Sequence, residues 1–219
     1  MMDSYNLRIR DGSKFFLFGP SNCGKTFYVV DFLLNIENFT ENYPRSIIFV
    51  YTIWQKKYDE IMSLVDYFIE DSDQLENQIN ERCKGQPTLI IFDDMIGSDR
   101  LKFVAKFFTV NGRHLSITMM FLSQRLFINN EYFRQISQNC DYFIIFRNPR
   151  NQRDILELAK QITPGSLELL DIYKSATEKP WSYLCINLTQ QCPQEIKYTS
   201  HHFDYDHKMI AYVLNKKST

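Results

Sequence analysis

Glycine and proline are scarce in this 219-residue sequence, at seven residues each, whereas phenylalanine occurs 18 times and tyrosine 13 times. Chains that stay disordered or form fibres are usually rich in glycine or proline and poor in aromatic residues. The composition therefore excludes those classes. It predicts packed structure throughout, in a chain long enough to bury a sizeable core.

Long apolar runs, a strong net charge and a regular cysteine pattern are also missing. No segment is apolar enough over a sufficient length to span a bilayer, and the acidic start MMDSYNLRIRDG does not resemble a signal peptide, so we expect a protein without a transmembrane segment that is not secreted. Five cysteines, an odd number without repeated spacing, indicate free thiols in a reducing compartment. The formal net charge of -1 argues against wrapping nucleic acid with the whole surface, so any DNA contact would use a local patch or a ring of several copies.

Short apolar segments alternate with helical patterns along the chain. Near-continuous hydrophobicity predicts buried strands of a parallel sheet at residues 14–19, 46–52, 88–94, 116–124 and 142–148. Helices are expected between these strands, and the tail is expected to add a helical segment, strands at 181–188 and near 195–200, and a final helix near 205–216. This alternation predicts one three-layer α/β domain over residues 1–219.

The first strand leads into a glycine-bounded loop. The sequence GPSNCGKT at 19–26 fits the pattern G-x-x-x-x-G-K-S/T, with an apolar strand before it and an amphipathic helix after it. The two glycines let successive backbone N–H groups point at phosphate oxygens, Lys25 reaches the β- and γ-phosphates, and the Thr26 hydroxyl can hold Mg²⁺. The predicted nucleotide-binding residues, for a ligand such as ATP, are Gly19, Pro20, Ser21, Asn22, Cys23, Gly24, Lys25, Thr26 and Phe27.

Two carboxylates end the third predicted strand. In TLIIFDDM, Asp93 is expected to hold the Mg²⁺ shell and Asp94 to polarise the attacking water. Many nucleoside triphosphatases have glutamate at the second position, and Asp94 is one methylene shorter. The alternative is a pair of acids that merely begins a turn at a strand end.

A polar pair, Ser123 and Gln124, ends the fourth predicted strand. If this strand lies between the phosphate-loop strand and the Asp93 strand, the Gln124 amide emerges beside the γ-phosphate, where it can orient water or report hydrolysis. The alternative is a polar residue at an ordinary strand end.

Together these features resemble the FtsK/HerA superfamily of P-loop ATPases. Within it, GPSNCGKT, IIFDDM, the GRH leading into the fourth strand and the LSQ ending it are most similar to the compact genome-packaging ATPases of double-jelly-roll DNA viruses, including the poxvirus-type enzyme and those of Polinton-like elements and virophages. KPWSYLCINL also looks like the closing segment of that group. The resemblance extends from about residue 14 to residue 203.

The resemblance implies an ATP-driven, Mg²⁺-dependent motor that threads viral double-stranded DNA into a preformed capsid. It implies a P-loop fold of the additional-strand type with a short C-terminal strand and helix extension, and a homo-oligomeric ring. Partners would be the DNA and proteins of the capsid vertex or its membrane, in the virion or at the assembly site of the host cell. By the same analogy Arg113 is the leading arginine finger, with Arg147 and Arg150 as reserves.

Two further groups of residues have both a functional and an ordinary explanation. Basic residues between the core strands are candidates for contacts with DNA phosphates or for solvated surface, namely Lys56, Lys57, Arg100, Lys102 and Lys106. A zinc site is a weaker alternative for the C-terminal segment, because no tight C-x-x-C pair accompanies its ligand types, which are Cys185, Cys192, His201, His202 and His207.

Two rival functions share the phosphate loop. A nucleoside or nucleotide kinase has a similar length, but the paired acids, Gln124 and the lack of an arginine-rich lid argue against it. A non-hydrolysing, nucleotide-gated assembly protein stays open because Asp94 replaces the more usual glutamate.

Overall fold

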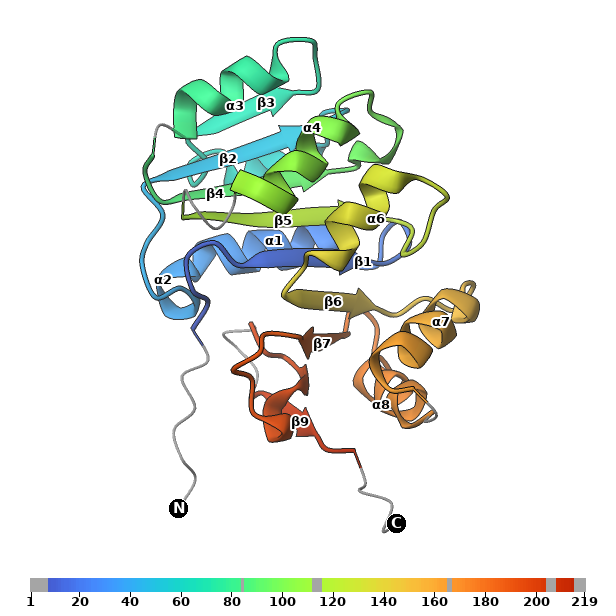
Figure 1. Cartoon of the computed structure of the whole chain (residues 1–219). Helices are drawn as coiled ribbons and strands as arrows, with labels where there is room; N and C mark the ends of the chain where they lie inside the picture. The colour runs from blue at the N-terminus through green and yellow to red at the C-terminus, as the bar shows by residue number, and fades with distance from the viewer. Residues whose placement is uncertain (1–7, 84, 112–115, 165–166, 204–207, 215–219) are drawn as a thin grey trace.

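The computed structural model describes residues 8–83, 85–111, 116–164, 167–203 and 208–214. Its centre is one continuous sheet with the strand order β3-β2-β4-β5-β1-β6-β7-β8-β9, drawn from top to bottom in Figure 1. Helices cover both faces, so the predicted three-layer α/β fold is confirmed.

The first six strands in this order run parallel. All five predicted core strands are present, each within a residue or two of its expected ends: β1 (Lys14–Phe18), β2 (Ser46–Tyr51), β4 (Thr88–Asp93), β5 (Ile117–Ser123) and β6 (Tyr142–Phe146). The edge strand β3 (Tyr67–Glu70) was not predicted, because only Ile69 in it is fully buried and its apolar pattern is weak.

The last three strands run antiparallel to their neighbours and form the C-terminal extension. They are β7 (Tyr183–Asn187), β8 (Tyr198–Ser200) and β9 (Ile210–Tyr212). The predicted final helix near 205–216 is wrong in its described part, which contains β9. Three residues of this segment pair with the free edge of β8, and this long-range pairing overrides the local helical pattern.

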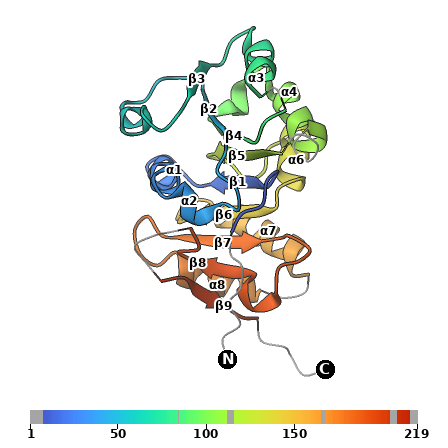
Figure 2. The ribbon, with the colours of Figure 1, turned by 90° about the vertical axis from the view of Figure 1, so that its left-hand side faces the viewer.

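Alternate residues of the parallel strands point to opposite faces and build two cores. In β1, Phe16 and Phe18 pack into one cluster, whereas Phe15 and Leu17 pack into the other. In Figure 2 the two faces appear on either side of the sheet, with α1 and α2 on one and α3, α4 and α6 on the other.

The face to which Phe15 and Leu17 point is covered by α1 (Lys25–Leu34), α2 (Ile36–Phe39) and the 3₁₀ helix η1 (Lys56–Ile61). All three helices contribute buried residues to the cluster on that face. The other face is covered by α3 (Leu75–Cys83), η2 (Met95–Gly97), α4 (Leu101–Lys106), the π-helical turn η3 (Phe107–Asn111), α6 (Glu131–Gln138), α7 (Gln152–Ile162) and α8 (Glu168–Ala176). A further 3₁₀ turn, η4 (Gln194–Ile196), precedes β8.

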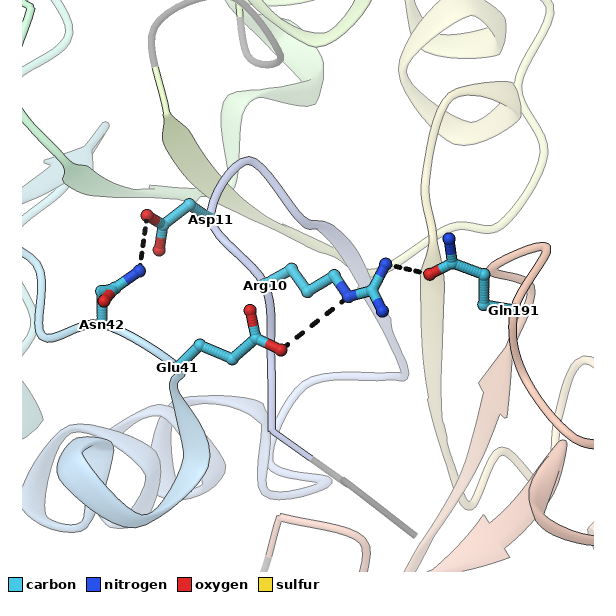
Figure 3. A network of polar contacts seen from close by, with 5 residues as sticks. All are labelled: Arg10, Asp11, Glu41, Asn42 and Gln191. Carbon is cyan, nitrogen blue, oxygen red and sulfur yellow. Dashed lines mark hydrogen bonds and ion pairs between the residues drawn. The ribbon is translucent and has the colours of Figure 1, made fainter.

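The segment before β1 links distant parts of the chain. Figure 3 shows Arg10 between Glu41 and Gln191. Nε of Arg10 lies 3.8 Å from Oε1 of Glu41, and the Arg10 guanidinium donates a hydrogen bond to the side-chain oxygen of Gln191. Asn42 donates a 3.0 Å hydrogen bond to Asp11 in the same network. These side chains are largely exposed, so they fix the course of the chain more than they add stability.

In the described part of the chain, no helix combines the length and the apolar character that crossing a membrane requires.

Candidate functional site

The carboxyl ends of three parallel strands bring the predicted site together. Strand β5 lies between β4 and β1, which is the arrangement that the expected role of Gln124 requires. Phe18 pairs with Ser123, and Asp93 pairs with Leu122. The amide of Gly19 donates a 3.2 Å hydrogen bond to the Ser123 carbonyl. The phosphate loop, the paired acids and Gln124 therefore start from the same edge of the sheet.

The loop owes its shape to residues with left-handed backbone. Gly24 has φ 109° and Asn22 has φ 61°, a region that glycine and asparagine adopt most readily. Gly19 is needed for space instead: a methyl group there would stand 2.5 Å from Cys23 Sγ and 2.8 Å from Phe146 Cβ. Helix α1 begins directly after Gly24, so its N-terminal amides face the loop.

The Lys25 ammonium lies inside the loop. Its Nζ donates to the carbonyls of Gly19 at 2.5 Å and Pro20 at 2.9 Å. Burial lowers the pKa of Lys25, and the negative charges of Asp93 and Asp94 oppose that shift. A triphosphate would replace these neutral carbonyls with charged oxygens, which bind an ammonium more strongly.

Asp93 is buried and held by a residue that the sequence analysis did not identify. The Tyr58 hydroxyl, on η1, donates a 2.6 Å hydrogen bond to Oδ2 of Asp93. Burial raises the pKa of Asp93, and the hydrogen bond from Tyr58 and the charge of Lys25 act in the opposite direction. No local signal pointed to Tyr58, because it belongs to a segment between two strands, 35 positions from its partner.

Asp94 and Gln124 are exposed beside this pair. Asp94 follows β4 with a left-handed backbone of φ 58°, which turns the chain sharply away from the sheet. The Ser21 hydroxyl donates a 3.1 Å hydrogen bond to Oε1 of Gln124 and so joins the loop to the end of β5. A cleft at this edge is lined by loop residues with both acids and Gln124, and also by Gln55 and Lys57.

The oxygen donors in the cleft suit Mg²⁺. The Thr26 hydroxyl and the Asp93 carboxylate both line it, and hard oxygen ligands of this kind are those that Mg²⁺ selects. Tyr58 occupies one carboxylate oxygen of Asp93 and fixes its orientation, as the outer partners of metal ligands do.

Two of the three arginine candidates, Arg147 and Arg150, belong to the described residues and follow β6. Arg113 is outside the described residues. Arg147 is exposed at the end of β6 and donates a 3.2 Å hydrogen bond to the Glu178 carbonyl, and the backbone amide of Arg150 donates to Asn148 Oδ1.

The five basic candidates for DNA contact lie on two different faces of the sheet. Lys56 and Lys57 are exposed on η1, on the face of α1. The other three line a pocket beside α4 on the opposite face, where Arg100 forms an ion pair with Asp73. One subunit therefore does not gather all five into a single patch.

In the C-terminal segment, His207 lies outside the described residues. His202 Nδ1 stands 2.9 Å from Thr199 Oγ1, and Cys192 Sγ donates to the Pro193 carbonyl. Within the described ranges no group of three or more His, Cys, Asp or Glu side chains is placed to hold a metal ion.

The sheet order and the loop at the end of β1 define a P-loop NTPase fold, and solved structures of that fold are similar to this chain. No family model and no curated protein matches its sequence. The genome packaging NTPase B204 of Sulfolobus turreted icosahedral virus 2, solved in complex with ATP-gammaS, has a TM-score of 0.52 at 15% identity, over 86% of this chain and 96% of that one.

Two other similar structures belong to larger proteins. The conjugation coupling protein TcpA of pCW3 has a TM-score of 0.53 at 12% identity, over 80% of this chain and 57% of that one. The type VII secretion ATPase EccC of Thermomonospora curvata has a TM-score of 0.51 at 10% identity, over 81% of this chain and 23% of that one. At these identities the similarity concerns the fold.

Proposed function

We propose that this chain is an ATP-hydrolysing motor that packages viral double-stranded DNA into a preformed capsid. The observation that carries the proposal is the convergence of Lys25, the Asp93–Asp94 pair and Gln124 on one cleft at the carboxyl edge of the sheet. The likeness to a viral genome packaging NTPase, over nearly the whole of both chains, supports the choice of motor.

Each residue of the cleft has a distinct role in the proposed reaction. The loop amides and Lys25 bind the phosphates, with Lys25 neutralising charge on the β- and γ-groups. Thr26 and Asp93 would hold Mg²⁺, which supplies positive charge against the phosphate oxygens when bound. Asp94 polarises the attacking water and Gln124 orients it.

The arrangement favours hydrolysis over the two rival functions. Asp94 and Gln124 are both exposed polar groups that line the cleft, where they suit a water molecule. A kinase needs a second substrate site there, and a non-hydrolysing protein needs neither group.

Coupling to DNA requires several subunits in this proposal. A subunit with a net charge of -1 has too weak a field to hold duplex DNA alone, whereas a ring converges its basic patches on one pore. We propose Arg113 as the finger that enters the neighbouring subunit's site.

The test is ATP hydrolysis with and without linear duplex DNA. We expect Mg²⁺-dependent phosphate release that is stimulated by DNA. This stimulation should fall steeply as the salt concentration rises. Lys25→Ala should reduce turnover by at least about 100-fold, because the transferring group loses its main positive partner. Lys160→Ala is the matched control, since that exposed lysine pairs with Glu157 on α7, outside the cleft.

The rival functions predict other outcomes. Transfer of phosphate to a nucleoside, without any effect of DNA, would favour the kinase. Tight ATP binding without phosphate release would favour the nucleotide-gated assembly protein. Near-normal turnover in Lys25→Ala would overturn the assignment of the loop itself.

A further inference from the structure

Two large aromatic side chains are exposed beside the phosphate loop. Phe27 on α1 is 69% exposed and Trp181, in the turn before β7, is 71% exposed, although rings of this size are usually covered in a folded protein. Both line one groove, whose other residues include Asn22, Gly24 and Thr26 of the loop. The groove is thus continuous with the phosphate site.

The backbone holds Trp181 against the loop. Its φ is 61°, in the left-handed region that a tryptophan rarely adopts. A methyl group on Gly24 would stand 3.5 Å from both Cβ and Cδ1 of Trp181, so the base of the side chain lies directly beside the loop. The turn itself is fixed, since Ser182 Oγ donates a 2.6 Å hydrogen bond to the Lys179 carbonyl and Arg147 donates to the carbonyl of Glu178.

The sheet order places Trp181 on the side where a nucleoside would leave the loop. Asp93 ends β4 and Gln124 follows β5, both on one side of β1, whereas β7 and Trp181 lie on the other side beyond β6. With Lys25 and the acids at the γ-phosphate end, a bound nucleotide would have that end near β4 and β5. Its α-phosphate would then lie toward Thr26 and Phe27, and its ribose and base would extend away from Gln124.

We infer that Trp181 and Phe27 form the binding surface for the nucleobase, on which a purine ring stacks while the loop holds its triphosphate. The inference rests on the proposed nucleotide-binding function and adds the recognition of the base to it. Stacking uses the π-face that every base has, so it favours large purines and discriminates little between adenine and guanine. Phosphate binding without a base would be correspondingly weak.

Trp181 also supplies the probe for the test. The chain contains two tryptophans, so Trp54→Phe leaves Trp181 as the single tryptophan. In that background, titration with ATP or GTP should quench the fluorescence, whereas inorganic tripolyphosphate should bind with little quenching. A tripolyphosphate titration that quenches as strongly as ATP would overturn the inference.

Affinity provides the second readout. Trp181→Ala should weaken ATP binding roughly 10- to 100-fold and leave tripolyphosphate binding unchanged, and Trp181→Phe should keep most of the affinity. Tyr43→Ala, which removes another exposed aromatic ring outside the groove, should change neither. If Trp181→Ala fails to fold, the fluorescence titration decides.

The outcomes separate the two proposals. If wild-type protein binds neither ATP nor tripolyphosphate, the proposed function fails and this inference with it. If it binds both, and Trp181→Ala weakens both equally or neither, nucleotide binding stands and the base site is overturned.

Discussion

The Tyr58 hydroxyl donates a 2.6 Å hydrogen bond to Oδ2 of Asp93, and both side chains are buried. The Tyr58 ring is held in place by aromatic neighbours, with its centroid 4.7 Å from that of Phe49 and 5.4 Å from that of Trp54. Because Lys57 adjoins Tyr58 on η1 and lines the cleft, the same short helix carries both a cation of the site and the support of its buried acid.

Tyr58→Phe should therefore weaken the use of Mg²⁺. Without the hydroxyl, one oxygen of Asp93 loses its donor and the carboxylate loses its fixed orientation. We expect the Mg²⁺ concentration for half-maximal ATP hydrolysis to rise roughly 10- to 100-fold, as is usual when the outer partner of a metal ligand is removed. The control is Tyr51→Phe, which removes a hydroxyl from a neighbouring ring. The ring centroid of Tyr51 lies 6.1 Å from that of Tyr58. Equal Mg²⁺ requirements in the two variants would contradict the role of Tyr58.

Asp93→Asn and Asp94→Asn should separate metal binding from water activation. Asp93→Asn should damage the use of Mg²⁺, whereas Asp94→Asn should slow hydrolysis about 100-fold or more and spare ATP binding. The measurement is a pair of titrations, one of Mg²⁺ against turnover and one of ATP against binding. A collapse of nucleotide affinity in Asp94→Asn would mean that the two roles are exchanged.

Gly19→Ala should destabilise the phosphate loop. The added methyl group would collide with Cys23 Sγ at 2.5 Å and Phe146 Cβ at 2.8 Å, and the second collision involves a stem atom that cannot rotate away. Overpacking of this kind costs about 1–3 kcal/mol, which is a fall of several degrees in Tm for a chain of this size. Gly97→Ala is the control, because a methyl group there meets no atom within 4 Å. A Gly19→Ala protein with unchanged Tm and ATP affinity would show that the loop adapts.

Cys23 should react with thiol reagents mainly at high pH. Burial raises the pKa of this thiol, and the ammonium of Lys25 only partly opposes the shift. The thiolate is the reactive form, so a raised pKa delays reaction to higher pH. In a Cys192→Ser background, the alkylation rate should rise with a midpoint above that of a free thiol in the same buffer, and ATP should slow it. Lys25→Met should move the midpoint higher still, and a fall instead would contradict the contact.

Arg113→Ala should leave ATP binding intact and nearly eliminate turnover if the residue acts across a subunit boundary. Mixing Arg113→Ala with Lys25→Ala subunits should then restore activity, because some interfaces pair an intact loop with an intact finger. Mixed assembly is shown first, for example by co-purification on a tag carried by one variant. If the mixtures are no more active than the two separate variants, Arg113 acts in its own subunit's site or takes no part in catalysis.

The sequence alone determined the elements whose signals are local. Near-continuous apolar runs identified the five core strands, since a strand buried on both faces has no polar positions to interrupt it. The glycines within 19–26 identified the proposed phosphate-binding loop, because the shape of a loop depends on the backbone angles of neighbouring residues. The two acids at the end of β4 identified the proposed metal ligand and the residue beside it.

Only the tertiary structure decided what depends on long-range pairing. The expected role of Gln124 required β5 to lie between β4 and β1, which the sequence did not determine and the sheet order shows. Residues 210–212 form β9 because β8 offers a free edge, which no local pattern records. The contacts of Tyr58 with Asp93 and of Trp181 with Gly24 join residues far apart in the chain. Such contacts form when the sheet assembles. Composition and periodicity predict which residues are buried in a helix or strand, but not which partner each side chain contacts.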